Sequence, residues 1–208
     1  VRRGPGMVRI DARLINVTNG YPLWSETFDS TERDFLVLQS DVAQKVARAL
    51  QLELRLADRE RLAETPTENP EAYDLYLRGR YSLNKRTADS IHKALGIFQQ
   101  AVAKDAQFAL GHAGAADAYI LRGKIGAMPG EEAAAHAWPE VSIALTIDPE
   151  LSEGYVSRAI LLTDFEWNWP EAEVDFQKAL SLNPNNAAGH HWYARHLDQL
   201  GRTEEALR

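Results

Sequence analysis

The sequence predicts a mainly α-helical protein, in which about 3.5 helical hairpins stack into a solenoid behind a small antiparallel β-meander and one helix. The first observation is a helix face made of Ala172, Phe176 and Ala179, which ends at Pro184 because proline has no N–H to donate. Small residues on both sides of one aromatic ring let a second helix approach closely. The second observation is that this pattern recurs. Its other copies are Ala94, Phe98 and Ala101, then Ala137, Val141 and Ala144, and a start at Ala206.

The first 28 residues predict antiparallel strands. Apolar and charged residues alternate from Val8 onward, which is the period of a strand with one buried face. The break in this alternation at Leu14-Ile15 predicts a β-bulge. Asn19-Gly20 favours a tight hairpin turn, since both residues tolerate positive φ, and Pro22 places the returning strand at a sheet edge.

A helix is expected after the capping cluster Asp29-Ser30-Thr31. The chain then becomes charged and afterwards rich in Pro and Thr, which predicts a linker at 61–69 between a first part, 1–60, and the repeats. The apolar stripe of the helix is Phe35, Leu38, Val42, Val46 and Ala49.

The distance between the copies indicates the kind of repeat. Ala101 and Ala144 are 43 residues apart, whereas Ala144 and Ala179 are 35 residues apart. The second spacing is close to the period of about 34 residues of one helix–turn–helix repeat. With Gly79 on the preceding helix, these residues resemble the tetratricopeptide repeat (TPR) family. They depart from it at Ala106, where the family usually has proline. The resemblance implies units at 70–106, 107–150, 151–185 and an incomplete 186–208.

The run Leu23-Trp24-Ser25-Glu26, followed by Phe28-Asp29, resembles the last part of the TolB amino-terminal-like domain of bacterial signalling proteins. The resemblance covers roughly residues 1–56, within the first part at 1–60. In that family the segment contains the closing strands and final helix of an α/β unit, commonly followed by TPRs and placed behind an effector. The effector is a winged-helix DNA-binding domain, a nucleotide cyclase or a protein kinase. The resemblance therefore implies the scaffold or sensor half of a bacterial transcription regulator or adenylate cyclase.

Both ends of the sequence predict a longer natural protein, because Val1 is not an initiator methionine and 186–208 stops inside a repeat. Without the earlier strands of the α/β unit, the three strands would have an exposed edge and face. We therefore expect residues 1–28 to pack on the first repeat or on a second copy of the chain. A homodimer formed through residues 1–56 is one hypothesis.

The composition excludes several classes. The 208 residues include no cysteine, which excludes disulfides and thiolate chemistry. The net charge of −7 belongs to the residues after 60, because the first 60 hold nine basic and nine acidic residues; we expect no direct nucleic-acid contact from an acidic repeat array. No stretch approaches the roughly 18 apolar residues of a membrane span, so no membrane insertion is expected. We expect a soluble protein, cytoplasmic, or periplasmic if its parent is membrane-anchored.

The sequence predicts no enzyme: no catalytic residue, cofactor or metal is assigned. The histidine cluster His190, His191 and His196 has offsets of one, five and six residues, whereas helical metal pairs need three or four. Our interpretation is that His190 packs against a neighbouring repeat and His191 faces the groove. Trp167 and Trp169 are a candidate exposed aromatic patch, although the favoured interpretation is that one Trp fills a gap between repeats.

The expected function is non-catalytic binding of a protein or peptide. Stacked hairpins present a concave surface lined by their first helices, and mixed charges with aromatic residues suit an extended peptide or a partner's helix. Two alternatives remain open: self-association through the N-terminal strands and helix, and a small-molecule-sensing domain. The groove positions of the TPR family, carried onto matching residues, are Tyr73, Tyr76, Arg80, Asn84, Asp117, Ser157, Asp164, His191, Arg195, Asp198 and Gln199.

Overall fold

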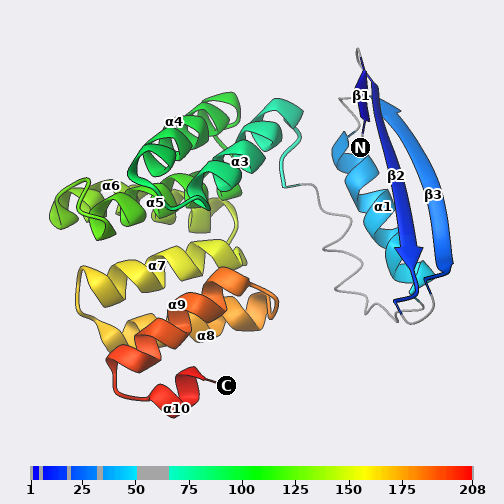
Figure 1. Ribbon diagram of the computed structural model, residues 1–208. Coiled ribbons are helices and arrows are strands. Elements are labelled where there is room, and N and C mark those ends of the chain that lie inside the picture. Colours follow the sequence, from blue (N-terminus) through cyan, green and yellow to red (C-terminus); the bar gives the residue numbers. More distant parts are fainter. Residues whose placement is uncertain (1, 5–6, 18–19, 32–34, 51–65, 208) are drawn as a thin grey trace. The chain divides into compact units, whose positions relative to one another are not determined.

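The chain divides into two compact units, Val1–Pro70 and Glu71–Arg208. Part of the predicted linker, 61–69, lies outside the described residues, so that boundary stays a prediction. Figure 1 shows the elements of both units. The computed structural model describes residues 2–4, 7–17, 20–31, 35–50 and 66–207.

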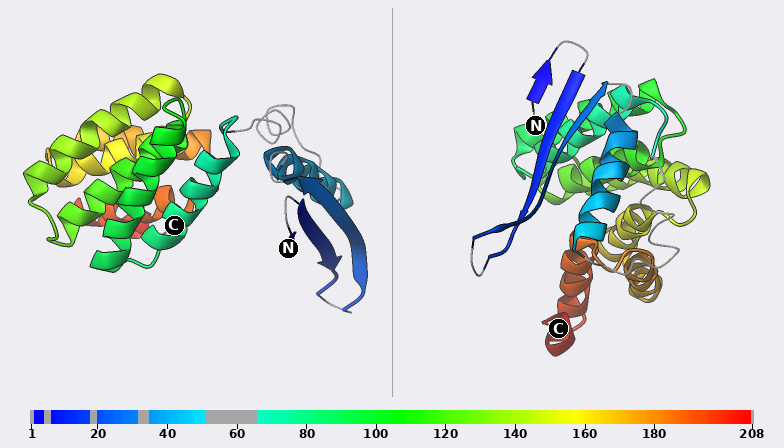
Figure 2. Two further views of the ribbon diagram at one scale, coloured as in Figure 1. Left: turned by 90° about the horizontal axis from the view of Figure 1, so that it is seen from above. Right: turned by 90° about the vertical axis from the view of Figure 1, so that its right-hand side faces the viewer.

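The N-terminal unit is an antiparallel sheet with one helix against one of its faces (Figures 1 and 2). Its strands are β1 (Arg2–Gly4), β2 (Met7–Ile15) and β3 (Pro22–Thr31), in the order β1-β2-β3, and the helix is α1 (Phe35–Ala49). The predicted bulge is confirmed, because the pairing of β2 with β3 shifts register at Leu14/Ile15. Within the described residues, the strand that begins at Pro22 lies at the edge of the sheet, as predicted.

The two faces of this sheet differ in chemistry. On the side of α1, Phe28 is buried, and Lys45 of α1 lies 4.8 Å over its ring and donates a 2.6 Å hydrogen bond to Glu26. On the other side, Arg9 of β2 makes two hydrogen bonds of 2.6 and 2.8 Å to Asp29 of β3. Within this unit, the face that α1 leaves uncovered therefore carries paired charges.

The second unit is a stack of helical hairpins, as predicted. The first helices of the hairpins carry most of the polar residues discussed below. In chain order the helices are α3 (Pro70–Leu83), α4 (Ala88–Lys104), α5 (Ala109–Lys124), α6 (Gly130–Ile147), α7 (Ser152–Asp164), α8 (Trp169–Leu182), α9 (Ala187–Gln199) and α10 (Thr203–Ala206).

Two glycines allow the first helices to close on an aromatic ring. A Cβ atom added to Gly79 of α3 or to Gly114 of α5 would lie 2.5 Å from the ring of Phe98 on α4. Carbon atoms do not approach so closely, so a side chain at either position would push its helix away from α4. Phe98 and Phe176 are both buried in the same core. The predicted packing of small residues around one aromatic ring is confirmed.

The second helices of the first three hairpins are each followed by an Asp or Asn whose side chain accepts a hydrogen bond from the next turn. Asp105, Asp148 and Asn183 follow α4, α6 and α8. In each case the side-chain oxygen accepts a hydrogen bond from the N–H two residues later, at 2.9, 2.9 and 3.1 Å. This turn explains why Ala106 can stand where proline is usual, since the preceding Asp already redirects the chain.

Candidate partner-binding surface

One polar network, centred on Asp117 of α5, joins three first helices. Arg80 of α3 donates from Nη1 to Oδ2 of Asp117 at 2.9 Å, and Ser157 of α7 donates from Oγ to Oδ1 at 2.7 Å. The Ser157 side chain is fully buried, while those of Arg80 and Asp117 are largely so. A single carboxylate therefore fixes the relative positions of α3, α5 and α7.

Burial dominates the electrostatics of this network. It raises the pKa of Asp117, and the guanidinium of Arg80 and the hydroxyl of Ser157 only partly oppose that rise. Burial likewise raises the pKa of the nearby Glu153 carboxyl and of the Tyr76 phenol. Burial works against the charge of Arg80, but Asp117 holds the pKa of the guanidinium above its usual value. Arg80 thus faces the carboxyl groups of both Asp117 and Glu153, so its positive charge is already compensated within the protein.

A second group of charges surrounds Trp192 of α9, which is only 8% exposed. Lys124 Nζ lies 4.8 Å from the centroid of the indole, Arg195 Cζ lies 5.1 Å from it, and Arg86 Cζ lies 5.7 Å from it. Cations favour this position because the face of an aromatic ring carries partial negative charge. We call these four residues the Trp192 cluster. They come from the α3–α4 turn, the end of α5 and the middle of α9.

One carboxylate balances part of this positive charge. Lys124 Nζ donates to Asp164 at the end of α7, and both side chains are 16% exposed. Within residues 66–207, neither Arg86 nor Arg195 has an ion pair with a carboxylate. Arg86 also has a φ of 56°, a left-handed conformation that is costly for a residue other than glycine.

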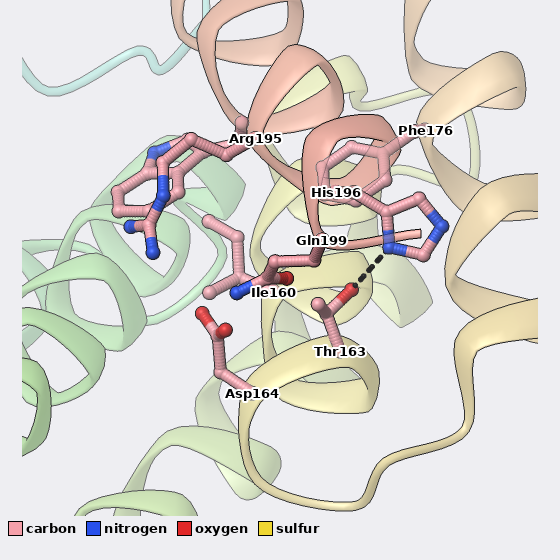
Figure 3. A pocket seen from close by; sticks show the side chains of 8 residues that line it. Ile160, Thr163, Asp164, Phe176, Arg195, His196 and Gln199 are labelled. Carbon is pink, nitrogen blue, oxygen red and sulfur yellow. Dashed lines mark hydrogen bonds between the residues drawn. The ribbon is translucent and has the colours of Figure 1, made fainter. Parts of the chain in front are cut away.

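A small cavity lies beside the Trp192 cluster, between α7 and α9 (Figure 3). Arg195 and Gln199 lie on the same side of it as Asp164, whereas His196 lies on the other side near Phe176. Its volume of about 10 Å³ has room for about one water molecule. A metabolite would not fit into this cavity.

Comparison with known proteins identifies the fold of the helical unit. A family model described as tetratricopeptide repeat matches residues 176–208. The crystal structure of TTC0263, a thermophilic TPR protein of Thermus thermophilus, superposes with a TM-score of 0.58 at 21% identity, over 85% of this chain and 87% of that one. The helical unit has the TPR fold. No helix in the described part of the chain is long and apolar enough to cross a membrane.

Sequence comparison gives a longer relative. The chain is 26% identical over 215 residues to a protein of Rhizobium meliloti (strain 1021) named "Putative adenylate cyclase 3". The match covers 99% of this chain but only 29% of the relative's length.

The structure brings together several of the predicted groove residues. Arg80, Asp117 and Ser157 form the central network, while Asp164 and Arg195 lie at the Trp192 cluster. Because Ser157 is fully buried, it can act on a partner only through Asp117.

The remaining predicted groove residues have different surroundings. Tyr73 is buried, with its ring 6.2 Å from that of Tyr76 and 6.5 Å from that of Phe108. Tyr73 therefore supports the TPR core rather than a contact surface. Asn84 is exposed at the end of α3, and Asp198 accepts a 3.0 Å hydrogen bond from Thr203.

The histidines differ from their predicted roles in one respect. The expectation that His190 packs against a neighbouring repeat is wrong, because its side chain is exposed and Nε2 lies 2.8 Å from the carbonyl oxygen of Pro184. The buried histidine is His196, whose Nδ1 lies 3.0 Å from Oγ1 of Thr163. The side chain of His191 is exposed and meets Trp192 edge to face.

The two candidate tryptophans lie at the start of α8 and just before it. Trp167 is 72% exposed and has a φ of 58°, whereas Trp169 is half-buried, with its ring 6.2 Å from that of Trp167. Pro170 lies in the first turn of α8. One of the two rings is thus available to solvent.

Sequence reasoning missed Arg86, Lys124 and Trp192. Trp192 lies beside His191, one of the predicted groove residues, but its own position points inward. Arg86 lies in a turn and Lys124 at the end of α5, outside the groove positions of the TPR family. The available signal was a basic residue in the turn after α3 and another at the end of α5.

Proposed function

We propose that this chain is a non-catalytic interaction module whose TPR unit binds a polypeptide segment of a partner protein along its first helices. The TPR fold is a scaffold for protein–protein interaction, because stacked hairpins present an extended surface. The observation that carries the proposal is the network of Arg80, Asp117 and Ser157, which holds three first helices in one arrangement. A surface fixed in advance loses less conformational entropy when a partner binds.

The chemistry of the surface supports a polypeptide as the ligand. Arg195 and His191 are exposed on α9 and can donate hydrogen bonds to backbone or side-chain oxygens, and Gln199 can donate and accept. Half-buried Tyr76 offers apolar area next to the charge of Arg80. A segment without regular structure could pair its backbone with these groups along several hairpins.

We infer further that the module is the scaffold or sensor part of a bacterial signalling or transcription-regulatory protein. Two likenesses support this: the relative named as an adenylate cyclase and the TolB-like run that begins at Leu23. Cyclase activity itself is not carried over, because the chain spans only 29% of that relative.

Capture of a partner tests the proposal. The full chain is immobilised and compared with a His191→Ala/Arg195→Ala variant, which changes two exposed residues of α9. The matched control is Arg78→Ala/His92→Ala, which removes the same two residue types from exposed positions on α3 and α4. A protein retained from bacterial lysate is identified by mass spectrometry and then purified for calorimetry.

We expect the partner to bind the original chain and the control alike, and to bind the α9 variant at least tenfold more weakly. Equal affinity for all three chains would place the binding site elsewhere. Circular dichroism verifies that the three chains have the same helical content.

Self-association is a second candidate, favoured by the edge position of β3. Among the residues that the structure describes, β3 (Pro22–Thr31) pairs with β2 on one side only, and an edge strand can pair with a second chain. Light scattering should then give the mass of a dimer, and Leu23→Lys/Thr27→Lys, at two exposed positions of β3, should return it to the mass of a monomer. A monomeric mass for the original chain would contradict self-association.

A further inference from the structure

The Trp192 cluster gathers cations from three separate parts of the TPR unit around one ring. Arg86 belongs to the turn between α3 and α4, Lys124 to the last turn of α5, and Arg195 to α9. Their charged groups lie 5.7, 4.8 and 5.1 Å from the centroid of the same indole. Like charges gathered around one ring repel one another, and the interaction of each cation with the ring opposes that repulsion.

The charge of the cluster is not balanced. Lys124 is paired with Asp164, so these two groups cancel. The charge of Arg86 acts to lower the pKa of Asp117, but the hydrogen-bond donors to this carboxylate are Arg80 and Ser157. Within residues 66–207 no carboxylate makes an ion pair with Arg86 or Arg195, which leaves two guanidinium groups of the cluster without a direct partner of opposite charge.

The backbone carries a further cost at the same place. Arg86 has a φ of 56° in a turn where glycine would be free of strain. A costly conformation that places a cation beside other cations is the kind of strain found at ligand-binding sites. Arg86 and Arg195 are both exposed, so an incoming group can reach them.

The type of cation narrows the choice of ligand. A guanidinium presents its N–H groups as a planar fork that fits two oxygens of one phosphate or carboxylate. Two guanidinium groups beside the same ring suit one compact group with several oxygens and two negative charges. A phosphate monoester carries about −1.5 to −2 charges and three acceptor oxygens, whereas two carboxylates spread the same charge over two side chains.

We propose that Arg86 and Arg195, held beside Trp192, bind a phosphorylated side chain of a partner polypeptide. This site deepens the proposed function and rests on it, since the phosphate is carried by the segment that lies along the first helices. Lys124 and Asp164 act as positioning residues, because their ion pair holds Lys124 against the indole.

Peptide titration followed by NMR tests the site on the full chain. The probes are a Gly-Ser peptide with one central phosphoserine, the same peptide with serine, the same peptide with Glu-Glu at the centre, and inorganic phosphate. The chain has five tryptophans, whose indole N–H signals can be followed separately. The Trp192 signal is assigned with Trp192→Phe, and the signal of Trp24 in the N-terminal unit is an internal control.

We expect the phosphopeptide to shift the Trp192 signal and to leave that of Trp24 unchanged. It should bind at least tenfold more tightly than the serine peptide. Arg86→Gln and Arg195→Gln should each weaken its binding by about tenfold, which corresponds to about 1.4 kcal/mol. The matched control is Arg78→Gln, which removes one positive charge from a 63% exposed side chain on α3 and should change the affinity less than twofold.

Three outcomes would overturn the proposal. Equal binding of the Glu-Glu peptide and the phosphopeptide would show that the site does not select phosphate. Equal binding of inorganic phosphate and the phosphopeptide would show an anion site that takes no part in polypeptide binding. An equal loss of phosphopeptide affinity for Arg78→Gln would show that binding depends on the overall charge of the chain and not on this site. In each case the capture experiment with the α9 variant still decides whether the surface binds a partner, so the two proposals fail separately.

Discussion

The two charge clusters of the TPR unit differ in how their charges are balanced. In the central network, Arg80 faces the carboxyl groups of Asp117 and Glu153, and every charge has an opposite neighbour. At Trp192, three cations surround one ring, and within residues 66–207 only Lys124 among them has an ion pair with a carboxylate, that of Asp164. Balanced, buried charges hold helices together, whereas an excess of one sign reduces stability and is explained more readily by a ligand. Local electrostatics therefore distinguishes a structural network from the proposed binding site within the TPR unit.

The largest expected effect is the loss of the cation from the central network. Arg80→Met leaves the buried carboxylate of Asp117 without a cation and should lower the free energy of unfolding by about 2 kcal/mol or more; a fully buried pair would lose about 3–5 kcal/mol. Urea denaturation measures the change. Arg78→Met on the same helix should stay within about 0.5 kcal/mol, and an equal loss from both variants would contradict a special role for Arg80.

The opposite sign is expected at the Trp192 cluster. Arg86→Gly removes both the repulsion and the left-handed strain, so it should raise the free energy of unfolding by about 1 kcal/mol. Arg86→Ala keeps the strain and should gain less. Thermal and urea denaturation of both variants separate the two causes, and a destabilised Arg86→Gly would mean that the arginine supports the fold.

The smallest effect is the pH dependence of two buried histidines. Burial opposes the charge of His112, but its Nδ1 lies 2.6 Å from Glu140 and its Nε2 lies 3.1 Å from the carbonyl oxygen of Ala106, and these contacts raise its pKa. The charge of Asp105 acts in the same direction. The stabilisation from His112 is therefore complete below about pH 6.5 and is lost as the pH rises through the folded-state pKa.

His196 should have the opposite pH dependence. Burial lowers its pKa, so its folded form resists protonation, and stability falls as the pH drops below about 6.5. The difference in unfolding free energy between the original chain and His112→Gln should shrink from pH 5.5 to 8.5. The difference for His196→Gln should grow over the same range. Parallel curves for the two variants would contradict the assigned environments.

Much of the TPR unit could be predicted because its determinants are local. The spacing of Ala172, Phe176 and Ala179 fixes one helix face, and Gly79 permits close contact with Phe98 whatever happens elsewhere in the chain. The helix ends were predicted from proline, whereas the structure shows that the side chain of Asp105 or its equivalent makes the turn. The TolB-like assignment of residues 1–60 and the pairing of its strands with another surface stay predictions.

The binding surface could be predicted only in part. Family positions indicated Arg80, Asp117 and Arg195, because these lie at fixed places on the first helices. The family positions did not indicate that Arg80 and Asp117 would pair with each other while Arg195 would have no ion pair within residues 66–207. The expectation that His190 would be buried was wrong, because an error of one residue in register turns a helical side chain by about 100°.

What the sequence by itself determined is the period of the helical hairpins and the helix face that carries the small and aromatic residues. Only the tertiary structure decided the charge balance. Arg86, Lys124 and Trp192 are far apart in the chain, and no local pattern relates them. They meet because stacking brings the α3–α4 turn, the end of α5 and the middle of α9 to the same ring. Electrostatic energy depends on distance in space, which a sequence pattern does not contain.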